Sequence, residues 1–175
     1  MTKIPDIIYM DDVSREIDGL YHNGIENGKT TYIPELDEIF RFLKGNVIVF
    51  GGIPNHGKST FALFLMLLQS INNGSKWAIF SPESYPAEMF YADLLRMYLG
   101  QSVIDGYPNK ASLLMLNKAK RFIGDHFFNL YPETESPTPD LIFDRFEQVV
   151  KLHKVDGCVI DPFNQLDNDW RSEGR

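Results

Sequence analysis

The sequence is poor in features that would indicate a secreted or membrane-bound protein. It has one cysteine, Cys158, so no disulfide can form within the chain, and a reducing compartment is expected. No apolar run approaches the roughly 20 residues that a membrane-spanning helix needs. The first residues also lack the basic and apolar zones of a secretory signal. These absences predict a cytoplasmic protein without a membrane partner.

Basic residues are scarce as well. Lysine and arginine number 17 against 24 aspartates and glutamates, which gives a net charge of −7. A surface that coats nucleic acid broadly clusters Lys and Arg, so this charge argues against one. It remains compatible with a narrow channel lined by a few basic groups. The length of 175 residues and a hydrophobic share of 43% are typical of one globular domain.

From residue 46 onward, short apolar runs alternate with helical patterns. The sequence predicts strands at 47–50, 77–80, 127–131 and 158–160. It predicts helices at about 11–20, 34–42, 58–70, 86–99, 110–123 and 138–154. Strands separated by helices pair in parallel through right-handed crossovers. The predicted fold is therefore α/β, a three-layer sandwich with a mainly parallel sheet.

A phosphate-binding motif lies between the first predicted strand and the next helix. It reads Gly52-x-x-x-x-Gly57-Lys58-Ser59, the strict P-loop pattern. The glycines let successive backbone N–H groups curl around phosphate oxygens, and the helix N-terminus adds partial positive charge. Lys58 is expected to neutralise the β- and γ-phosphates, and the Ser59 hydroxyl to ligate Mg²⁺. The expected nucleotide-binding residues are Gly52, Pro54, Asn55, His56, Gly57, Lys58, Ser59 and Thr60.

Two acidic residues follow predicted strands at the same sheet edge as this motif. Asp161 ends the run 158–160 and is expected to help hold the magnesium ion; the alternative is a turn aspartate ahead of Pro162. Glu83 follows the strand 77–80, where a carboxylate can orient or deprotonate a water that attacks the γ-phosphate. The alternative for Glu83 is an exposed loop residue or a helix cap.

Several other residues are interpreted as structural. Cys158 is expected to be a small core residue, and the four histidines show no zinc-binding spacing. A helical stripe is assigned to the core: Phe61, Phe64, Leu65 and Leu68. The aromatic residues of the following helix are assigned to the core or to a subunit contact in preference to base stacking: Phe90, Tyr91 and Tyr98. Phe163 is considered for a position near bound DNA, but this role is not the favoured one.

Four stretches together resemble the superfamily 4 replicative helicases, the DnaB-like and Twinkle-like ring helicases built on a RecA-type core. They are Gly28-Lys29-Thr30-Thr31-Tyr32-Ile33-Pro34-Glu35-Leu36-Asp37, then Gly51 through Phe61 including Pro54, then Phe80-Ser81-Pro82-Glu83-Ser84-Tyr85-Pro86, and Val159-Ile160-Asp161-Pro162-Phe163-Asn164-Gln165-Leu166. The first is similar to the segment that opens the family's core, and the second to its Walker A. The third is similar to the segment that bears the catalytic glutamate, and the fourth to a Twinkle-like Walker B.

The resemblance implies a hexameric motor that couples ATP hydrolysis to movement along single-stranded DNA. It implies that Glu83 is the activating base, and that residues 1–30 form a linker and subunit-contact segment ahead of a RecA-like core at 31–175. The apolar spacing of Val13, Ile17 and Leu20 fits packing on a neighbouring subunit or on the chain's own core.

In the family, strands with a sensor residue, DNA-gripping loops and an arginine finger follow Walker B. Arg171 and Arg175 lie too close to Asp161 to be that finger and are interpreted as solvated. The chain is thus expected to be the N-terminal portion of a helicase core, with weak activity alone and a tendency to self-associate. The alternatives are another RecA-type ATPase, or a non-catalytic nucleotide-binding interaction module.

Overall fold

The computed structural model describes residues 4–25, 27–132 and 137–166. Arg171 and Arg175 lie outside the described residues. The chain divides into two compact units, residues 1–48 and 49–175, whereas the sequence-based division fell at residue 30. None of the described helices is long and apolar enough to cross a membrane.

The first unit begins with helix α1, Met10–Asn23. Asp12 stabilises its start, because its carboxylate accepts a hydrogen bond from the Tyr9 N–H at 3.0 Å. The helix ends at Gly24, whose N–H donates to the Leu20 carbonyl at 2.9 Å. The helix predicted at 11–20 is confirmed, but it contains no buried residue. Its apolar stripe is therefore solvent-accessible, with Leu20 54% exposed.

Helix α2, Pro34–Asp37, is shorter than the predicted helix 34–42. The Asp37 carboxylate explains this difference. It accepts hydrogen bonds from the Thr31 N–H at 2.6 Å and the Thr31 hydroxyl at 2.7 Å, and a further one from the Thr30 hydroxyl. The backbone then turns back, because Lys29 and Phe42 form an antiparallel bridge. A residue that pairs with another strand cannot also continue a helix.

The predicted strand at 47–50 is not formed. Val47 is 90% exposed and Val49 is 85% exposed, and no described strand pairs with either residue. An apolar run becomes a strand only when its N–H and C=O groups find a neighbouring backbone. Local composition alone could not supply that neighbour.

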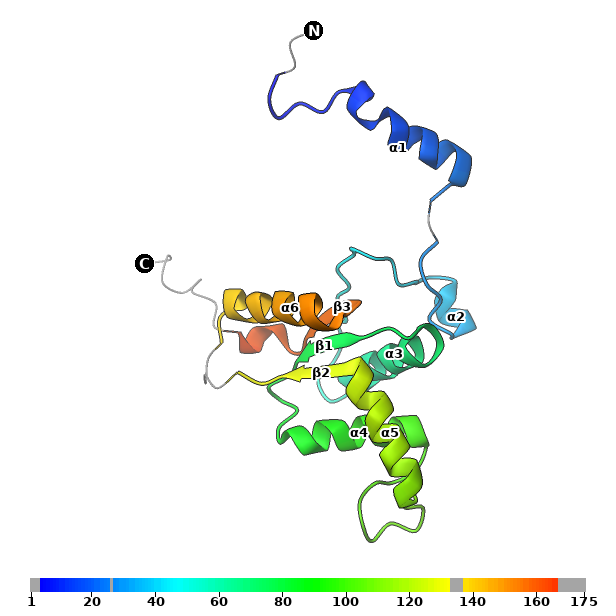
Figure 1. The fold of residues 1–175 in the computed structure, drawn as a ribbon, viewed down its shortest axis with the longest axis vertical. Helices are drawn as coiled ribbons and strands as arrows, with labels where there is room; N and C mark the ends of the chain where they lie inside the picture. The colour runs from blue at the N-terminus through cyan, green and yellow to red at the C-terminus, as the bar shows by residue number, and fades with distance from the viewer. Residues whose placement is uncertain (1–3, 26, 133–136, 167–175) are drawn as a thin grey trace. The chain divides into compact units, whose positions relative to one another are not determined.

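The second unit contains a parallel sheet of three strands among its described residues (Figure 1). They are β1 (Trp77–Phe80), β2 (Phe127–Leu130) and β3 (Gly157–Ile160), in the order β2-β1-β3. The central strand β1 is buried along its whole length, as its uninterrupted apolar composition predicts. In register, Phe80 lies between Leu130 and Ile160, so all three strands end together.

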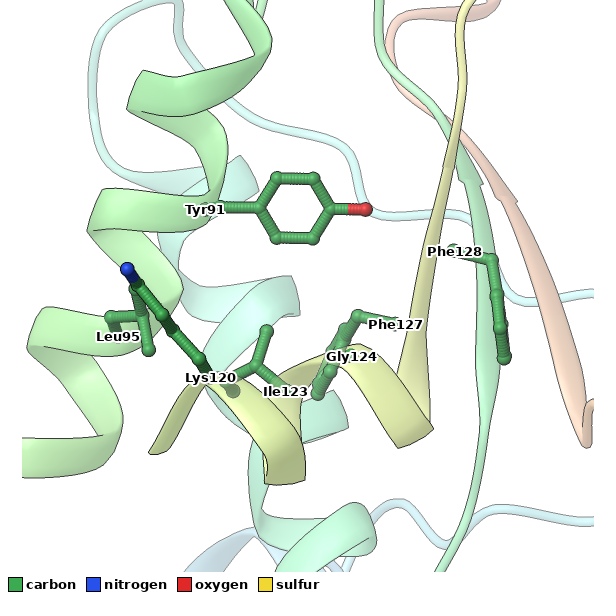
Figure 2. Close-up of a pocket in the computed structure, with 7 residues that line it drawn as sticks. All are labelled: Tyr91, Leu95, Lys120, Ile123, Gly124, Phe127 and Phe128. Carbon is green, nitrogen blue, oxygen red and sulfur yellow. The ribbon is translucent and has the colours of Figure 1, made fainter. Parts of the chain in front are cut away.

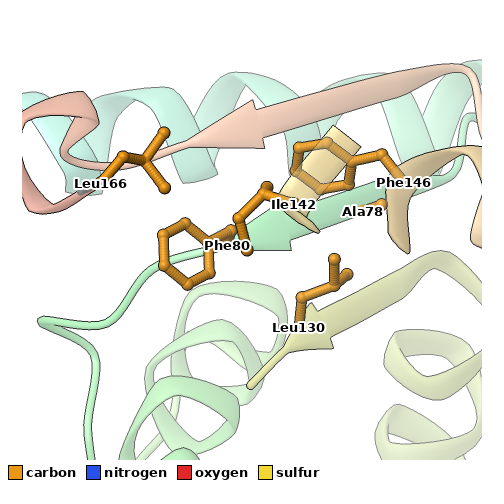
Figure 3. Packing of buried hydrophobic residues seen from close by; sticks show 6 residues of the cluster. All are labelled: Ala78, Phe80, Leu130, Ile142, Phe146 and Leu166. Carbon is orange, nitrogen blue, oxygen red and sulfur yellow. The ribbon is translucent and has the colours of Figure 1, made fainter. Parts of the chain in front are cut away.

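Helices cover both faces of this sheet. Helix α6, Pro139–His153, packs over β1, and its Ile142 and Phe146 meet Ala78 and Phe80 from the strand (Figure 3). Among the described residues, the other α-helices of this unit are α3 (Lys58–Asn73), α4 (Ala87–Leu99) and α5 (Leu113–His126). The α/β class is confirmed for the described residues. A short 3-10 helix, η1 (Phe163–Gln165), follows β3.

Helix α5 begins three residues later than predicted and ends at His126. The Ser112 hydroxyl caps it by accepting a hydrogen bond from the Met115 N–H at 3.3 Å. Lys110 instead forms a bridge with Ser102 and lies outside the helix. The cap residue therefore sets the start of α5, and the preceding backbone is committed to a different pairing.

The Trp77 side chain connects the sheet to α3 by hydrogen bonds. Its indole N–H donates to the Met66 carbonyl and to the Ser70 hydroxyl, each at 3.1 Å. The indole ring lies over Gly157, the residue paired with Trp77 across β1 and β3. A Cβ added to Gly157 would lie 2.4 Å from Cζ3 of the Trp77 ring, so only glycine leaves room for the indole.

The predicted core assignments are partly wrong. On α3, Leu65 is 1% exposed, but Phe61 and Phe64 are each 41% exposed. The buried residues of this helix are Leu65, Met66, Leu67, Gln69 and Ser70. Helical spacing identified the apolar side of α3. It could not predict which turns along that side are buried.

Cys158 is exposed, contrary to the prediction that it lies in the core. Its strand β3 pairs on one side with β1, and its other edge has no partner among the described strands. Nearby protein atoms still desolvate the thiolate and raise the pKa of the Cys158 thiol. The apolar run 158–160 indicated a strand correctly, but burial of the strand depends on neighbours on both sides.

Candidate functional site

The loop that follows residue 50 turns sharply into α3. Gly57 is the residue before the helix and adopts a left-handed conformation, with φ 78° and ψ 18°. Its carbonyl accepts the first helical hydrogen bond, from the Phe61 N–H at 2.8 Å. Asn55 also has a positive φ of 62°. Such angles suit glycine and asparagine, and they let a short loop curl at the mouth of a helix.

The lysine of the loop folds back over it. Lys58 Nζ donates to the Ile53 carbonyl at 3.0 Å. A Cβ added to Gly52 would lie 3.1 Å from Lys58 Cδ, so the absence of a side chain at Gly52 leaves space for the lysine. His56 contacts the loop as well, with its Nδ1 2.8 Å from the Pro54 carbonyl oxygen. The loop backbone thus contacts the ammonium group of Lys58.

The start of α3 is electropositive. Lys58 is its first residue, no acidic residue lies in its first turn, and Ser59 and Thr60 are exposed there. Unpaired backbone N–H groups and the helix dipole add partial positive charge at this end. These properties suit an anionic ligand with several oxygen atoms, such as a phosphate chain.

Helix α3 runs antiparallel to β1. Its last turns lie beside the beginning of the strand, where Met66 and Ser70 accept the Trp77 hydrogen bonds. The first turn of α3 therefore extends toward the carboxyl end of the sheet (Figure 1). Ligands of open parallel sheets bind at that end.

The two acidic residues predicted for the site, Glu83 and Asp161, follow strands at the carboxyl end of the sheet. Asp161 directly follows β3, and its N–H donates to the Phe80 carbonyl at 2.9 Å. Glu83 follows β1 in a tight turn and is exposed. Within the described residues, neither carboxylate has a hydrogen-bond or ion-pair partner. The structure thus brings both acids to one edge of the sheet, while their roles remain predictions.

An apolar cavity of about 320 Å³ lies elsewhere, between α4, α5 and β2 (Figure 2). Tyr91, Leu95 and Ile123 line it, and Lys120 is the charged residue at its margin. The Tyr91 hydroxyl accepts a hydrogen bond from the Asn129 N–H at 3.4 Å. None of the predicted site residues lines this cavity. In the described ranges, no group of three His, Cys, Asp or Glu side chains could hold a metal ion.

Two of the aromatic residues assigned to the core or to a subunit contact pack within the chain. Phe90 is buried, and Tyr98 stacks on Phe122 with ring centroids 4.6 Å apart. Phe163, at the carboxyl end of β3, is 57% exposed. Sequence reasoning overlooked a contact beside Glu83, where Tyr85 and Tyr131 stack on each other. Each tyrosine precedes a proline, but no local pattern in the sequence pairs the two.

The chain is distantly similar to a plant protein. The chain is 28% identical over 164 residues to the Twinkle homolog protein, chloroplastic/mitochondrial, of Arabidopsis thaliana. The match covers 90% of the chain but spans only 23% of that relative's length. No protein-family model matches the chain, and no solved structure matches it. At this identity, the comparison supports a relationship at the level of a superfamily.

Proposed function

We propose that the chain binds ATP with Mg²⁺ at residues 52–60 and forms the first part of the ATP-hydrolysing, RecA-like core of a ring-shaped replicative DNA helicase. The observation that carries the proposal is the loop around Lys58, closed by Gly52 and Gly57 at the mouth of α3. The distant likeness to the Twinkle homolog protein agrees with it. In the complete assembly, we expect a hexamer that translocates on single-stranded DNA.

Each residue of the loop has a role in this proposal. Lys58 exchanges its hydrogen bond with the Ile53 carbonyl for one with a β- or γ-phosphate oxygen. The N–H groups at the start of α3 hold the remaining phosphate oxygens. The residues that fit Mg²⁺ are Ser59 and Asp161, because hydroxyl and carboxylate oxygens are the ligands this ion prefers. When bound, Mg²⁺ supplies neutralisation of the phosphate charge.

Glu83 is the proposed general base. Its carboxylate is exposed and has no partner among the described residues, so it is available to accept a proton from a water molecule. The water attacks the γ-phosphorus, the bond to the bridging oxygen breaks, and ADP and phosphate are released. Asp161, the residue after the adjacent strand β3, would hold the metal through its carboxylate.

Nucleotide binding is tested by calorimetric titration with ATP and Mg²⁺. We expect the wild-type chain to bind and Lys58→Ala to weaken binding about 10-fold or more, the usual effect of losing a charge-assisted hydrogen bond. Lys118→Ala, an exposed lysine of α5, is the matched control and should bind normally. Equal affinity of Lys58→Ala and the wild type would contradict the proposed site.

Hydrolysis is tested with Glu83→Gln. This variant should retain ATP affinity and lose the slow hydrolysis that we expect of the wild-type chain. Glu88→Gln, an exposed residue in the first turn of α4, serves as the control. Single-stranded DNA at low salt should raise the rate in a longer version of the protein. Tight binding without any hydrolysis would instead identify a nucleotide-binding interaction module.

A further inference from the structure

The loop between β1 and α4 presents Glu83 on a short turn. The Ser84 N–H donates to the Ser81 carbonyl at 3.1 Å, and the two serine hydroxyls lie 2.7 Å apart. Pro82 and Glu83 are the two central residues of this turn, and proline favours the first of those positions. Ser81 is 4% exposed. The turn is therefore anchored at its base, and Glu83 projects from it.

An aromatic contact holds the far side of the same loop. The rings of Tyr85 and Tyr131 stack, with centroids 5.5 Å apart and an interplanar angle of 28°. Tyr131 is the first residue after β2, and the last residue of β2, Leu130, is paired with Phe80 of β1. The stack thus connects the loop that carries Glu83 to the neighbouring strand. Both rings are largely exposed, Tyr85 by 68% and Tyr131 by 55%.

The backbone of the turn sets the position of the Glu83 side chain. Within the described residues its carboxylate has no hydrogen-bond or ion-pair partner, so its location follows from the backbone of the turn alone. A general base must come within about 2.6–3.2 Å of the proton it removes. A displacement of about 1 Å can lower a rate about 100-fold. Contacts that hold the turn therefore bear directly on the rate.

We propose that Tyr131 is a positioning residue for Glu83. It acts through Tyr85, whose ring it stacks on, and so restrains the turn formed by residues 81–84. This inference rests on the proposed function, because it takes Glu83 as the general base. The stack restrains the turn, whereas no hydrogen bond within the described residues restrains the Glu83 carboxylate. Tyr131 itself contacts neither nucleotide nor water in this scheme.

The first test measures the turn itself and needs no catalytic activity. Amide hydrogen exchange of Ser84 and ring-to-ring nuclear Overhauser effects are compared in the wild type, Tyr131→Phe, Tyr131→Ala and Tyr107→Ala. Tyr107 is also exposed, at 58%, and is not part of the stack, so it provides the control. We expect faster Ser84 exchange in Tyr131→Ala alone. Unchanged Ser84 exchange in that variant would overturn the inference.

The second test measures ATP hydrolysis in the same four proteins. An aromatic stack has a strength that corresponds to about a 2- to 12-fold effect, so kcat of Tyr131→Ala should fall by that factor. KM should stay within error, and Tyr131→Phe should restore kcat because the ring is kept. A fall in nucleotide affinity, or a parallel loss of folded protein, would show a merely structural role and overturn the inference.

The two tests separate the inference from the proposed function. If the wild type fails to bind ATP, the proposed function is wrong, and the positioning role for Tyr131 is overturned with it. If the wild type hydrolyses ATP and Tyr131→Ala does so equally fast, the proposed function stands and the inference is overturned. If Tyr131→Ala hydrolyses ATP more slowly and its Ser84 amide exchanges faster, the proposed function and the inference are both supported.

Discussion

At the scale of single residues, Gly157 decides whether β1 and β3 can pair around Trp77. The Cβ of an alanine at this position would lie 2.4 Å from one ring carbon of Trp77 and 2.7 Å from another. The indole cannot retreat without giving up its hydrogen bonds to α3. Gly157→Ala should therefore lower the free energy of unfolding by about 1–3 kcal/mol, the usual cost of overpacking. Urea denaturation followed by circular dichroism measures this.

Gly124 offers a matched control for that substitution. It lies within α5, and no atom lies within 4 Å of the Cβ that an alanine would add. Gly124→Ala should raise the free energy of unfolding by about 0.4–1 kcal/mol, because alanine restricts the unfolded chain and favours the helix. Equal effects of the two alanines would refute the steric argument for Gly157.

Asp37 makes the first unit sensitive to acid. Hydrogen bonds from the Thr30 and Thr31 hydroxyls hold the pKa of this carboxyl below its ordinary value, and Arg41 adds a small electrostatic contribution. A lowered pKa means that the folded state favours the charged carboxylate. The resulting stability is complete above about pH 4 and is lost as the pH falls further, through the pKa of the folded state.

This acid sensitivity is observable locally. The Thr31 amide resonance should move as the pH falls below about 4, because its hydrogen bond to the carboxylate weakens. Asp37→Asn should give a Thr31 resonance that no longer responds to pH in this range. A Thr31 amide that titrates identically in both proteins would exclude Asp37 as the cause.

At the scale of secondary-structure elements, the start of α6 is stabilised by Thr138. Its hydroxyl accepts a hydrogen bond from the Leu141 N–H at 3.3 Å, and Pro139 follows in the first turn. Thr138→Ala should lower the free energy of unfolding by about 1 kcal/mol, whereas Thr138→Ser should be nearly neutral. Thermal denaturation of the two variants provides the comparison. A Thr138→Ser loss as large as that of alanine would show that the cap does not matter.

Elements that depend on local signals could be predicted from the sequence. The capping threonine of α6, the apolar run of β1 and the glycine that ends α4 each act within a few residues. Failures occurred where distant partners decide the outcome. Residues 47–50 have the composition of a strand but find no described partner, and Cys158 is exposed because β3 is paired on one side only.

The same distinction holds for the candidate site. The loop at residues 52–59 and its place before α3 could be predicted because the pattern lies in consecutive residues. The common edge of Glu83 and Asp161 could be predicted because parallel strands end together, while the roles of these residues stay predictions. The Tyr85–Tyr131 stack could not be found, since it joins two loops distant in sequence. The length of α2 was also missed, because Asp37 bonds back to Thr31 before the helix can continue.

At the scale of the whole molecule, we expect the isolated chain to self-associate. The outer edge of β3 carries backbone N–H and C=O groups that no described strand satisfies, and such edges pair readily with other chains. Large apolar side chains of α3 are exposed as well, among them Phe61 and Phe64. Sedimentation velocity over a series of concentrations should show a rising mean mass.

A lysine substitution on the exposed edge tests whether β3 causes the self-association. Cys158→Lys places a charge in the middle of β3 and should shift the sedimentation profile toward the monomer, because charged side chains block edge pairing. Lys118→Ala, on the surface of α5, should leave the profile unchanged. A purely monomeric wild type at every concentration would contradict the expectation.

The indole of Trp77 gives the molecule a built-in optical reporter. It is one of two tryptophans in the sequence, and the other, Trp170, lies outside the described residues. The Trp77 ring lies against Gly157 of β3, and the Trp77 indole N–H donates a hydrogen bond to α3, the helix whose first turn carries Lys58. In a Trp170→Phe background, the emission wavelength of this single fluorophore would report any axial shift of α3, so ligand-induced movement could be timed without an added dye.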